Sequence, residues 1–512
     1  MQEQNQTMRV LCAIDLGAHA ARMLIAQCPG KDQLDILEDF DVTIPLGTNV
    51  FHTGSISASS IRILCEIFRN FRKKMDEYGV TECRAIATSA VREAANSEIL
   101  IERIKHETGI ELQLYEGADE ARLNYLSVIH TLPKRLNFHT KKAMIADIGT
   151  GACQISTYDK GSMTFTETLK IGTLRILETI PGATSVAALR ESMMPTIDNA
   201  FSDLIYSGVD FQGDMVISTG ASVRMLFRIF MANKGHKELP PLYKVTKDEF
   251  DDMLENMEEL SIGEISSRHD IRQELAEAVL PCALLVRELF RITKAKELLI
   301  PMVSLKMGLM LDFANSLLAE KDEFEQQTLG LVRSIACKYR CDSDFFTKTE
   351  ENAIFLFRKM QKLHGLTKRH LLLLRIAAIL HKCGLFLNNQ AYHKHSAYII
   401  SATEIPGISL SERLIVSQTA RYQRKGLPQK QHTAFQSLPQ NDRNVILKLS
   451  SLLRIACILS NRGITPDMIQ IRQEKDRIII RNIATRTYTD GNTIRGDLEY
   501  FFYTFAVELI LQ

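Results

Sequence analysis

Two stretches of the sequence share one pattern of apolar and polar positions. AIDLGAHAARMLIA, which starts at Ala13, and IADIGTGACQIS, which starts at Ile145, each contain an apolar run, an Asp-x-Gly turn and a second apolar run. This pattern predicts a β-hairpin, because glycine adopts turn conformations that other residues avoid and allows a neighbouring group to approach closely. The repeat therefore predicts two related halves whose hairpin tips build a site between them.

The rest of the first half predicts a βαβ unit. Residues 57–78 carry apolar side chains at helical spacing, residues 83–88 form a short apolar run typical of a buried strand, and a helix is expected to open at Ser89. A strand at 112–115 and a helix at 118–129 follow. Strands that alternate with helices favour an α/β fold.

A polar, basic tract at residues 131–142 predicts the boundary between the halves. After the second hairpin, at 143–158, we expect a helical stretch at 166–177, which reads TETLKIGTLRIL. A strand at 215–218 and a turn at TGAS follow it. The second half thus repeats the order of the first with different residues.

The pattern becomes helical beyond Asp322. Long amphipathic helices are predicted there, at residues 323–340, 349–363, 370–382, 392–402, 411–422 and 440–460. An alternating strand, DRIIIRNI, and an aromatic-rich helix at 497–511 predict a small α+β module at the end. The predicted domains are residues 1–133, 134–315, 316–463 and 464–512.

Composition and charge restrict the function classes. The 512-residue chain is 45% apolar, which suits several globular domains, and its formal net charge of +1 predicts neither nucleic acid nor a membrane as partner. The ten cysteines show no paired CxxC spacing, which favours reduced core thiols over a zinc site. With a polar N-terminus and no run that we expect to cross a bilayer, these features predict a cytoplasmic protein.

Six ordered motifs carry a resemblance to a known family. They read IDLGAHAARMLIA, IATSAVREAANSE, YEGADEARLNYLSV, ADIGTGACQIS, LKIGTLRI and STGASVRML. In order and approximate spacing they resemble the exopolyphosphatase and guanosine pentaphosphate phosphohydrolase family, the Ppx/GppA phosphatases. LRIAAILHKCGLFLNNQAYHKHSAYII resembles the HD-like helical domain of the longer members of that family.

The resemblance implies a fold class and an activity. The fold would be α/β, with two actin-like ATPase (ribonuclease H-like) halves followed by an all-α HD-like domain and the small α+β C-terminal module. The activity would be hydrolysis of terminal phosphoanhydrides with Mg²⁺ in the cleft between the halves. The substrate would be polyphosphate or guanosine pentaphosphate. The oligomeric state, including a homodimer, is left undecided by the sequence.

The two hairpin tips hold the first candidate site residues. Gly17, Gly149 and Gly151 would let backbone N–H groups approach phosphate oxygens. Asp15 and Asp147, at the strand ends, are the candidate metal ligands, because carboxylates suit magnesium. A single Asp-x-Gly is more simply an ordinary turn, whereas two in register favour a site.

Glu120, in the DEAR segment, matches the general base that the resemblance implies, the group that activates water. The alternative is a solvated acid that stabilises the helix N-terminus. Arg92, which matches a family motif after a strand, and Arg22 are candidate phosphate-binding residues because guanidinium presents a planar fork of donors. Arg22 could equally form a structural ion pair.

The TGAS turn completes the candidate site. Thr219, Gly220 and Ser222 resemble the phosphate or nucleotide loop of the family. A plain helix cap is the alternative.

Departures from the family pattern leave two functions open. The first tip has Ala18, His19 and Ala20 where the family has Ser-Asn-Ser, and the second has Ala152 and Gln154 where it has a hydroxyl and a carboxylate. Each lost donor or charge costs about 10²-fold or more in rate. The chain is therefore interpreted as a hydrolase of reduced activity, with a silent polyphosphate- or alarmone-binding regulator as the alternative.

The HD-like domain departs further from its pattern. Lys382 follows His381 where a metal site needs aspartate, and Gln423 stands where the family often has histidine. Basic residues nearby, including Arg424 and Lys425, suggest a surface for a polyanion, and a solvated helix face is the alternative.

Overall fold

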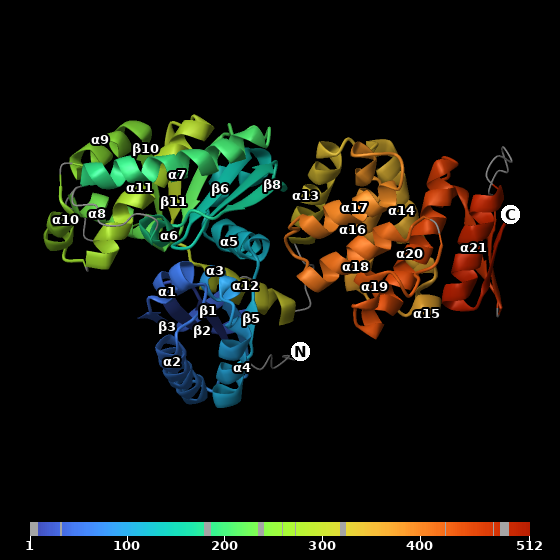
Figure 1. Cartoon of the computed structure of the whole chain (residues 1–512), viewed down its shortest axis with the longest axis horizontal. Helices are drawn as coiled ribbons and strands as arrows, with labels where there is room; N and C mark the ends of the chain where they lie inside the picture. Colours follow the sequence, from blue (N-terminus) through green and yellow to red (C-terminus); the bar gives the residue numbers. More distant parts are fainter. Residues whose placement is uncertain are drawn as a thin grey trace, which may run out of the picture. The chain divides into compact units, whose positions relative to one another are not determined.

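The computed structural model divides the chain into two compact units, Met1–Phe324 and Glu325–Gln512 (Figure 1). The described residues are 9–30, 33–178, 186–233, 240–258, 260–271, 273–317, 324–424, 426–474, 476–481 and 491–512. The first unit contains two α/β sheets, and the second is mainly helical.

The first sheet has the strand order β3-β2-β1-β4-β5. Its strands are β1 (Arg9–Leu16), β2 (Ala20–Gly30), β3 (Gln33–Thr43), β4 (Glu82–Ala87) and β5 (Leu112–Leu114). Its helices are α1 (Leu46–Thr53), α2 (Ala58–Glu77), α3 (Ser89–Glu93), α4 (Ser97–Thr108) and α5 (Gly117–Thr131). Strands β1 and β4 are parallel and α2 lies between them in the chain, so the predicted βαβ unit is confirmed.

The second sheet repeats this order. It runs β10-β11-β9-β6-β7-β8, so β6, β7, β8 and β9 correspond to β1, β2, β3 and β4. Its strands are β6 (Lys142–Ile148), β7 (Cys153–Asp159), β8 (Ser162–Leu169), β9 (Met215–Thr219), β10 (Leu242–Thr246) and β11 (Glu297–Pro301). Its helices are α6 (Thr173–Glu178), α7 (Val186–Tyr206), α8 (Ala221–Asn233), α9 (Lys247–Glu258), α10 (Ile262–His269) and α11 (Gln273–Thr293). The predicted duplication is confirmed.

The helix predicted at 166–177 is wrong in its first part. Residues up to Leu169 belong to β8, and helix α6 begins only at Thr173. The threonines of β8 alternate with other residues, and on β8 Thr166 and Thr168 contact Gln154 of β7. This period of two is that of a strand, and threonine is a β-branched residue that favours strands.

Helix α12 (Leu305–Leu317) returns from the second sheet to the first. Leu309 and Phe313 pack in one buried cluster with Leu11 of β1 and Leu123 of α5. A Cβ at Gly308 would lie 2.0 Å from the carbonyl oxygen of Leu123, so only glycine allows this approach of α12 to α5. The chain therefore connects the two halves twice, before β6 and after β11.

The second unit contains the predicted amphipathic helices. Helices at the predicted positions are α13 (Phe324–Lys338), α14 (Ser343–Lys359), α15 (Gln361–His364), α16 (Lys368–Leu380), α17 (Tyr392–Ala402), α18 (Leu410–Arg421) and α20 (Gln440–Asn461). The short helix α19 (Thr433–Gln436) lies outside the predicted ranges. Helix α14 begins earlier than predicted because Asp342 caps it, accepting from the N–H groups of Asp344 and Phe345.

The C-terminal module has three strands rather than one. They are β12 (Gln470–Gln473), β13 (Arg477–Arg481) and β14 (Glu508–Leu511), and the helix is α21 (Gly491–Phe505). The helix predicted at 497–511 therefore ends too late. Ala506 has a φ of +53°, which breaks the helix, and the following residues pair with the apolar strand β13.

One helix among the described residues, α20, is long and apolar enough to cross a membrane by length and composition. The sequence analysis expected none. Most of this helix is buried inside the protein, and a core helix passes the same test.

Candidate active site

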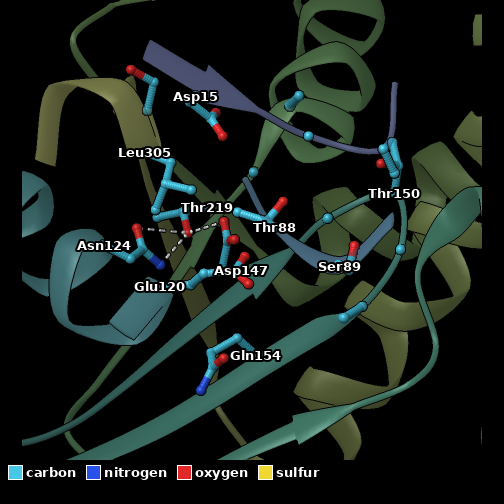
Figure 2. A pocket seen from close by; sticks show the side chains of 18 of the residues that line it. Asp15, Thr88, Ser89, Glu120, Asn124, Asp147, Thr150, Gln154, Thr219 and Leu305 are labelled. Atoms are coloured by element: carbon cyan, nitrogen blue, oxygen red, sulfur yellow. Dashed lines mark hydrogen bonds between the residues drawn. The ribbon is translucent and has the colours of Figure 1, made fainter. Parts of the chain in front are cut away.

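The hairpin tips of the two sheets, the start of α5 and the start of α8 surround one cavity of about 110 Å³ (Figure 2). Predicted site residues that line it are Asp15, Gly17, Arg22, Glu120, Asp147, Gly149, Gly151, Thr219 and Gly220. Arg92 and Ser222 are predicted residues that do not line it. The hydroxyl of Ser222 lies 3.1 Å from that of Thr173. Residues of both Asp-x-Gly turns thus line one cavity.

The two hairpin tips close in the same way. The N–H of Gly17 donates to the carbonyl of Ala20 at 2.9 Å, and the N–H of Gly149 donates to that of Ala152 at 2.9 Å. These two N–H groups are therefore engaged within their own hairpins, and the predicted role of the glycines in letting phosphate approach stays a prediction. In the described part of the chain, the N–H of Gly151 has no backbone acceptor and is a donor left for an anion.

At two further positions only glycine fits, because a Cβ atom would overlap with neighbouring atoms. A Cβ at Gly151 would lie 2.3 Å from the Ser89 hydroxyl, so the second tip rests against the first half. Gly220 has a φ of +114°, and a Cβ there would lie 2.3 Å from the carbonyl oxygen of Ile148. Helix α8, which follows β9 in the chain, can therefore begin against the end of β6 and beside the cavity.

Asp15 is a buried carboxylate with one oxygen free. Its Oδ2 accepts from Nη1 of Arg22 at 3.1 Å, whereas its buried Oδ1 has no hydrogen-bond partner among the described residues. Burial raises the pKa of Asp15, although the Arg22 guanidinium opposes this. An unsatisfied buried oxygen of this kind suits a cation.

Asp147 is held by a chain of hydrogen bonds that crosses the two halves. Thr219 donates to Oδ1 of Asp147 at 2.8 Å, and Nδ2 of Asn124 donates to Thr219 at 2.9 Å (Figure 2). Burial raises the pKa of Asp147, and the Thr219 hydrogen bond opposes this. The sequence analysis missed Asn124, although it follows Glu120 by four residues on one face of α5.

Glu120 points into the cavity and not to the end of its helix. Glu116 and Asp119 form the capping box of α5, in which the N–H of Glu116 donates to Asp119 at 3.2 Å. Oε1 of Glu120 instead accepts from Nη1 of Arg92 at 2.9 Å. A Cβ at Gly117 would lie 2.0 Å from Thr168 Oγ1, so glycine lets the start of α5 reach the second half.

The pKa of Glu120 lies near neutrality. Burial raises it from 4.5 to about 7, the Arg92 guanidinium opposes this, and the charges of Asp147 and Asp15 add to it. A carboxyl group with such a pKa exchanges its proton at physiological pH.

The arginines differ from the prediction in their contacts. Arg22 is paired with Asp15, and Arg92 is paired with Glu120 and also donates to the carbonyl of Tyr115. Arg224, in the first turn of α8, lines the cavity and was missed. In the sequence, Arg224 is indicated only by its position in the STGASVRML motif, two residues after the TGAS turn.

The departures in the second tip are accommodated by new hydrogen bonds. Gln154 lines the cavity, its Nε2 donates to Thr166 Oγ1 at 2.8 Å, and its Oε1 accepts from Thr168 Oγ1 at 2.9 Å. Ala152 also lines the cavity. Gln154 is thus held by two hydrogen bonds at the position where the resemblance implies a carboxylate.

The donor set fits magnesium in part. Among the described residues no three His, Cys, Asp or Glu side chains come together as a ligand set. Magnesium, however, is commonly bound by one or two carboxylates with phosphate oxygens and water as the remaining ligands. Asp15, with its free Oδ1, and Asp147 supply that number.

The HD-like position of the helical unit, where Lys382 replaces the aspartate that a metal site needs, is occupied by other contacts. His381 is buried with Nε2 3.4 Å from Sγ of Cys457, and burial lowers its pKa to about 3. Nζ of Lys382 lies 3.3 Å from the ring centroid of Phe345. Lys425, part of the predicted basic surface, lies outside the described residues, and a polyanion surface stays a prediction.

Two related halves, opposed hairpin tips and a cleft with three carboxylates define an actin-like fold with an acidic cleft. The family model described as Ppx/GppA phosphatase family matches residues 25–317, and the one described as Ppx/GppA phosphatase, domain III matches residues 330–500. The chain belongs to the Ppx/GppA phosphatase family, and the predicted family is confirmed.

Curated relatives are enzymes of this type. Over 458 residues the chain is 21% identical to a guanosine-5'-triphosphate,3'-diphosphate pyrophosphatase of Vibrio vulnificus, covering 88% of this chain and 86% of the relative. Over 224 residues it is 25% identical to exopolyphosphatase 1 of Mycobacterium leprae, covering 43% and 64%. The chain is therefore a hydrolase of the Ppx/GppA type.

A solved structure confirms the predicted fold class. The Aquifex aeolicus member of the family is 22% identical, with a TM-score of 0.52 over 62% of this chain and 100% of that one. An exopolyphosphatase of Cytophaga hutchinsonii has the same TM-score at 18% identity, over 60% and 98%. The HD-like character of the helical region stays a prediction.

Proposed function

We propose that this hydrolase releases the terminal phosphate of polyphosphate or guanosine pentaphosphate by direct attack of water, with Glu120 as general base. The observation that supports it is a carboxylate with a pKa of about 7 in one cavity with Asp15 and Asp147. A general base is most effective when its pKa lies near the working pH.

The reaction needs one proton transfer. Ionised Glu120 takes a proton from water, the water oxygen bonds to the terminal phosphorus, and the bond to the bridging oxygen breaks with its electron pair on the leaving phosphate. Asp15 and Asp147 would hold magnesium, which neutralises phosphate charge when bound. Thr219 and Asn124 keep the Asp147 carboxylate in one orientation.

The size of the cavity limits what it recognises. A volume of about 110 Å³ is small, since pockets for larger ligands measure about 300 Å³ or more. The cavity therefore suits a terminal phosphoryl group and the attacking water. Both proposed substrates end in this group.

One experiment tests the proposal directly. Phosphate release is measured with polyphosphate and with guanosine pentaphosphate side by side, each with and without magnesium. Magnesium-dependent release from either substrate supports hydrolysis. Binding without release supports the alternative, a silent regulator, which the altered residues Ala152 and Gln154 in the cavity wall favour.

Arg92 is expected to set the pH dependence of the reaction. Since its guanidinium lowers the pKa of Glu120, Arg92→Met should move the acid limb of the kcat/KM profile to higher pH, above its parent position near pH 7. Activity should then fall more at pH 6.5 than at pH 8.5. Arg92→Lys, which keeps the charge, should leave the limb near its parent position. An unshifted limb in Arg92→Met would show that Glu120 does not titrate in the rate.

Restoring the second tip distinguishes a weakened site from a rebuilt one. The double variant Ala152→Ser with Gln154→Glu returns a hydroxyl and a carboxylate to residues that line the cavity. Phosphate release should rise about tenfold or more, because one transition-state contact is commonly worth at least that. Thr166 and Thr168 already contact position 154, so the new carboxylate has partners. An equal or lower rate would favour a pocket rebuilt around another ligand.

A further inference from the structure

We infer that Arg224, and not Arg22 or Arg92, is the arginine that binds the oxygens of the phosphate in this cavity. The inference deepens the proposed function and rests on it for the identity of the substrate. The sequence pattern instead predicts phosphate binding by the other two arginines.

The contacts of the three arginines carry the inference. Nη1 of Arg22 lies 3.1 Å from Oδ2 of Asp15, and Nη1 of Arg92 lies 2.9 Å from Oε1 of Glu120. Both guanidinium groups therefore already form an ion pair with a carboxylate. Arg224 lines the cavity and its Nη1 donates to the carbonyl of Val303. In the described part of the chain it forms no ion pair.

The position of Arg224 is electrostatically unfavourable without an anion. Burial and the neighbouring Arg22 charge lower the pKa of Arg224, and the charges of Asp147, Asp41 and Asp39 oppose this. The side chain is half-buried, and a charge withdrawn from water is normally paired because its desolvation is costly. A phosphate in the cavity would supply the missing negative charge.

The chemistry of the side chain fits a phosphoryl group. Guanidinium carries five N–H donors in a planar fork and binds two oxygens of a phosphate at once. One donor of Arg224 is fixed by Val303, which orients the group. The Gly220 turn brings the first turn of α8, and with it Arg224, to the cavity wall.

The test measures binding separately from catalysis. Melting temperature is recorded with increasing inorganic phosphate for the full-length parent, Arg224→Met, Arg224→Lys and a control, Arg228→Met. Arg228 lies one turn further along α8 and is exposed. Because a ligand stabilises the folded form that binds it, the parent and the control should show the same rise.

Arg224→Met should show only the smaller, non-specific rise that phosphate gives to any protein, and Arg224→Lys an intermediate one. Without phosphate, Arg224→Met should melt no lower than the parent, since it removes a half-buried charge for which the described residues provide no ion pair. KM for the hydrolysed substrate should rise about tenfold or more, because the variant loses a charge-assisted hydrogen bond to the phosphate.

The outcomes separate this inference from the proposed function. A phosphate response in Arg224→Met equal to that of the parent would overturn the inference, even if the parent hydrolyses its substrates. A response that depends on Arg224 in a parent that releases no phosphate would support the inference and overturn hydrolysis. A lower melting temperature of Arg224→Met without phosphate, together with a lower one in Arg224→Lys, would assign Arg224 a structural role and overturn the inference.

Discussion

Glu120→Gln is expected to lower turnover by about 10²–10⁴-fold, the usual contribution of a general base, while phosphate still binds. Glutamine keeps the shape of the side chain and an oxygen that accepts from Arg92, but it cannot take a proton from water. The measurement is the single-turnover rate of phosphate release, with binding of inorganic phosphate followed by melting temperature.

The same variant should be more stable than the parent at high pH. The folded-state pKa of Glu120 is raised from 4.5 to about 7, so the folded protein holds this proton at pH values where the unfolded chain has lost it. Stability therefore falls as pH rises from about 4.5 to 7, by at most about 3 kcal/mol. Glu120→Gln removes this cost, so its melting temperature should exceed that of the parent at pH 8 and match it more closely at pH 5.

Asp119→Asn is the matched control on the same helix. Asp119 belongs to the capping box of α5, so this variant should lose stability without a comparable loss of turnover. A Glu120→Gln protein that releases phosphate at the parent rate would contradict the assignment and leave Glu120 as a helix-start acid.

Local patterns were enough to find the halves and the carboxylates. The Asp-x-Gly repeat predicted two hairpins, and the structure places Asp15 and Asp147 at equivalent strand ends beside one cavity. Glu120 needed the family resemblance, because an acid in the first turn of a helix is more simply a capping residue. The capping box of Glu116 and Asp119 explains why Glu120 is free for another role.

The partners of the charged groups could not be predicted from local patterns. Arg22 pairs with Asp15 across a hairpin, whereas Arg92 reaches Glu120 from a different helix. The acceptor of Arg224, the carbonyl of Val303, lies 79 residues further along the chain. Such choices depend on packing between distant segments, so a sequence pattern identifies an arginine but not the group that it contacts.

The strand β8 shows the same limit for secondary structure. Its threonines read as part of a helical stretch, but each pairs with β7 across the sheet, where Thr168 and Thr166 hold Gln154. Sheet pairing with a neighbouring strand overrides weak local preference. Because of this error the sequence pattern does not predict that Thr168 lines the cavity beside Gln154.

Asp147→Asn is expected to remove the response to magnesium and to lower turnover by about 10²-fold or more. Asparagine keeps an oxygen that accepts from Thr219, so the chain of hydrogen bonds from Asn124 can persist while the charge is lost. Magnesium that binds the folded parent should raise its melting temperature, and this rise should be absent in the variant. The readout is independent of catalysis.

Asp159→Asn is the control from the other end of the same hairpin, where the side chain is exposed at the end of β7. It should keep both the magnesium response and turnover. Without magnesium, Asp147→Asn should melt no lower than the parent at neutral pH, because burial raises the pKa of Asp147 and so disfavours its charge. A magnesium response that survives in Asp147→Asn would place the metal on other groups, and a lower melting temperature without magnesium would show that the carboxylate holds the two halves together rather than a cation.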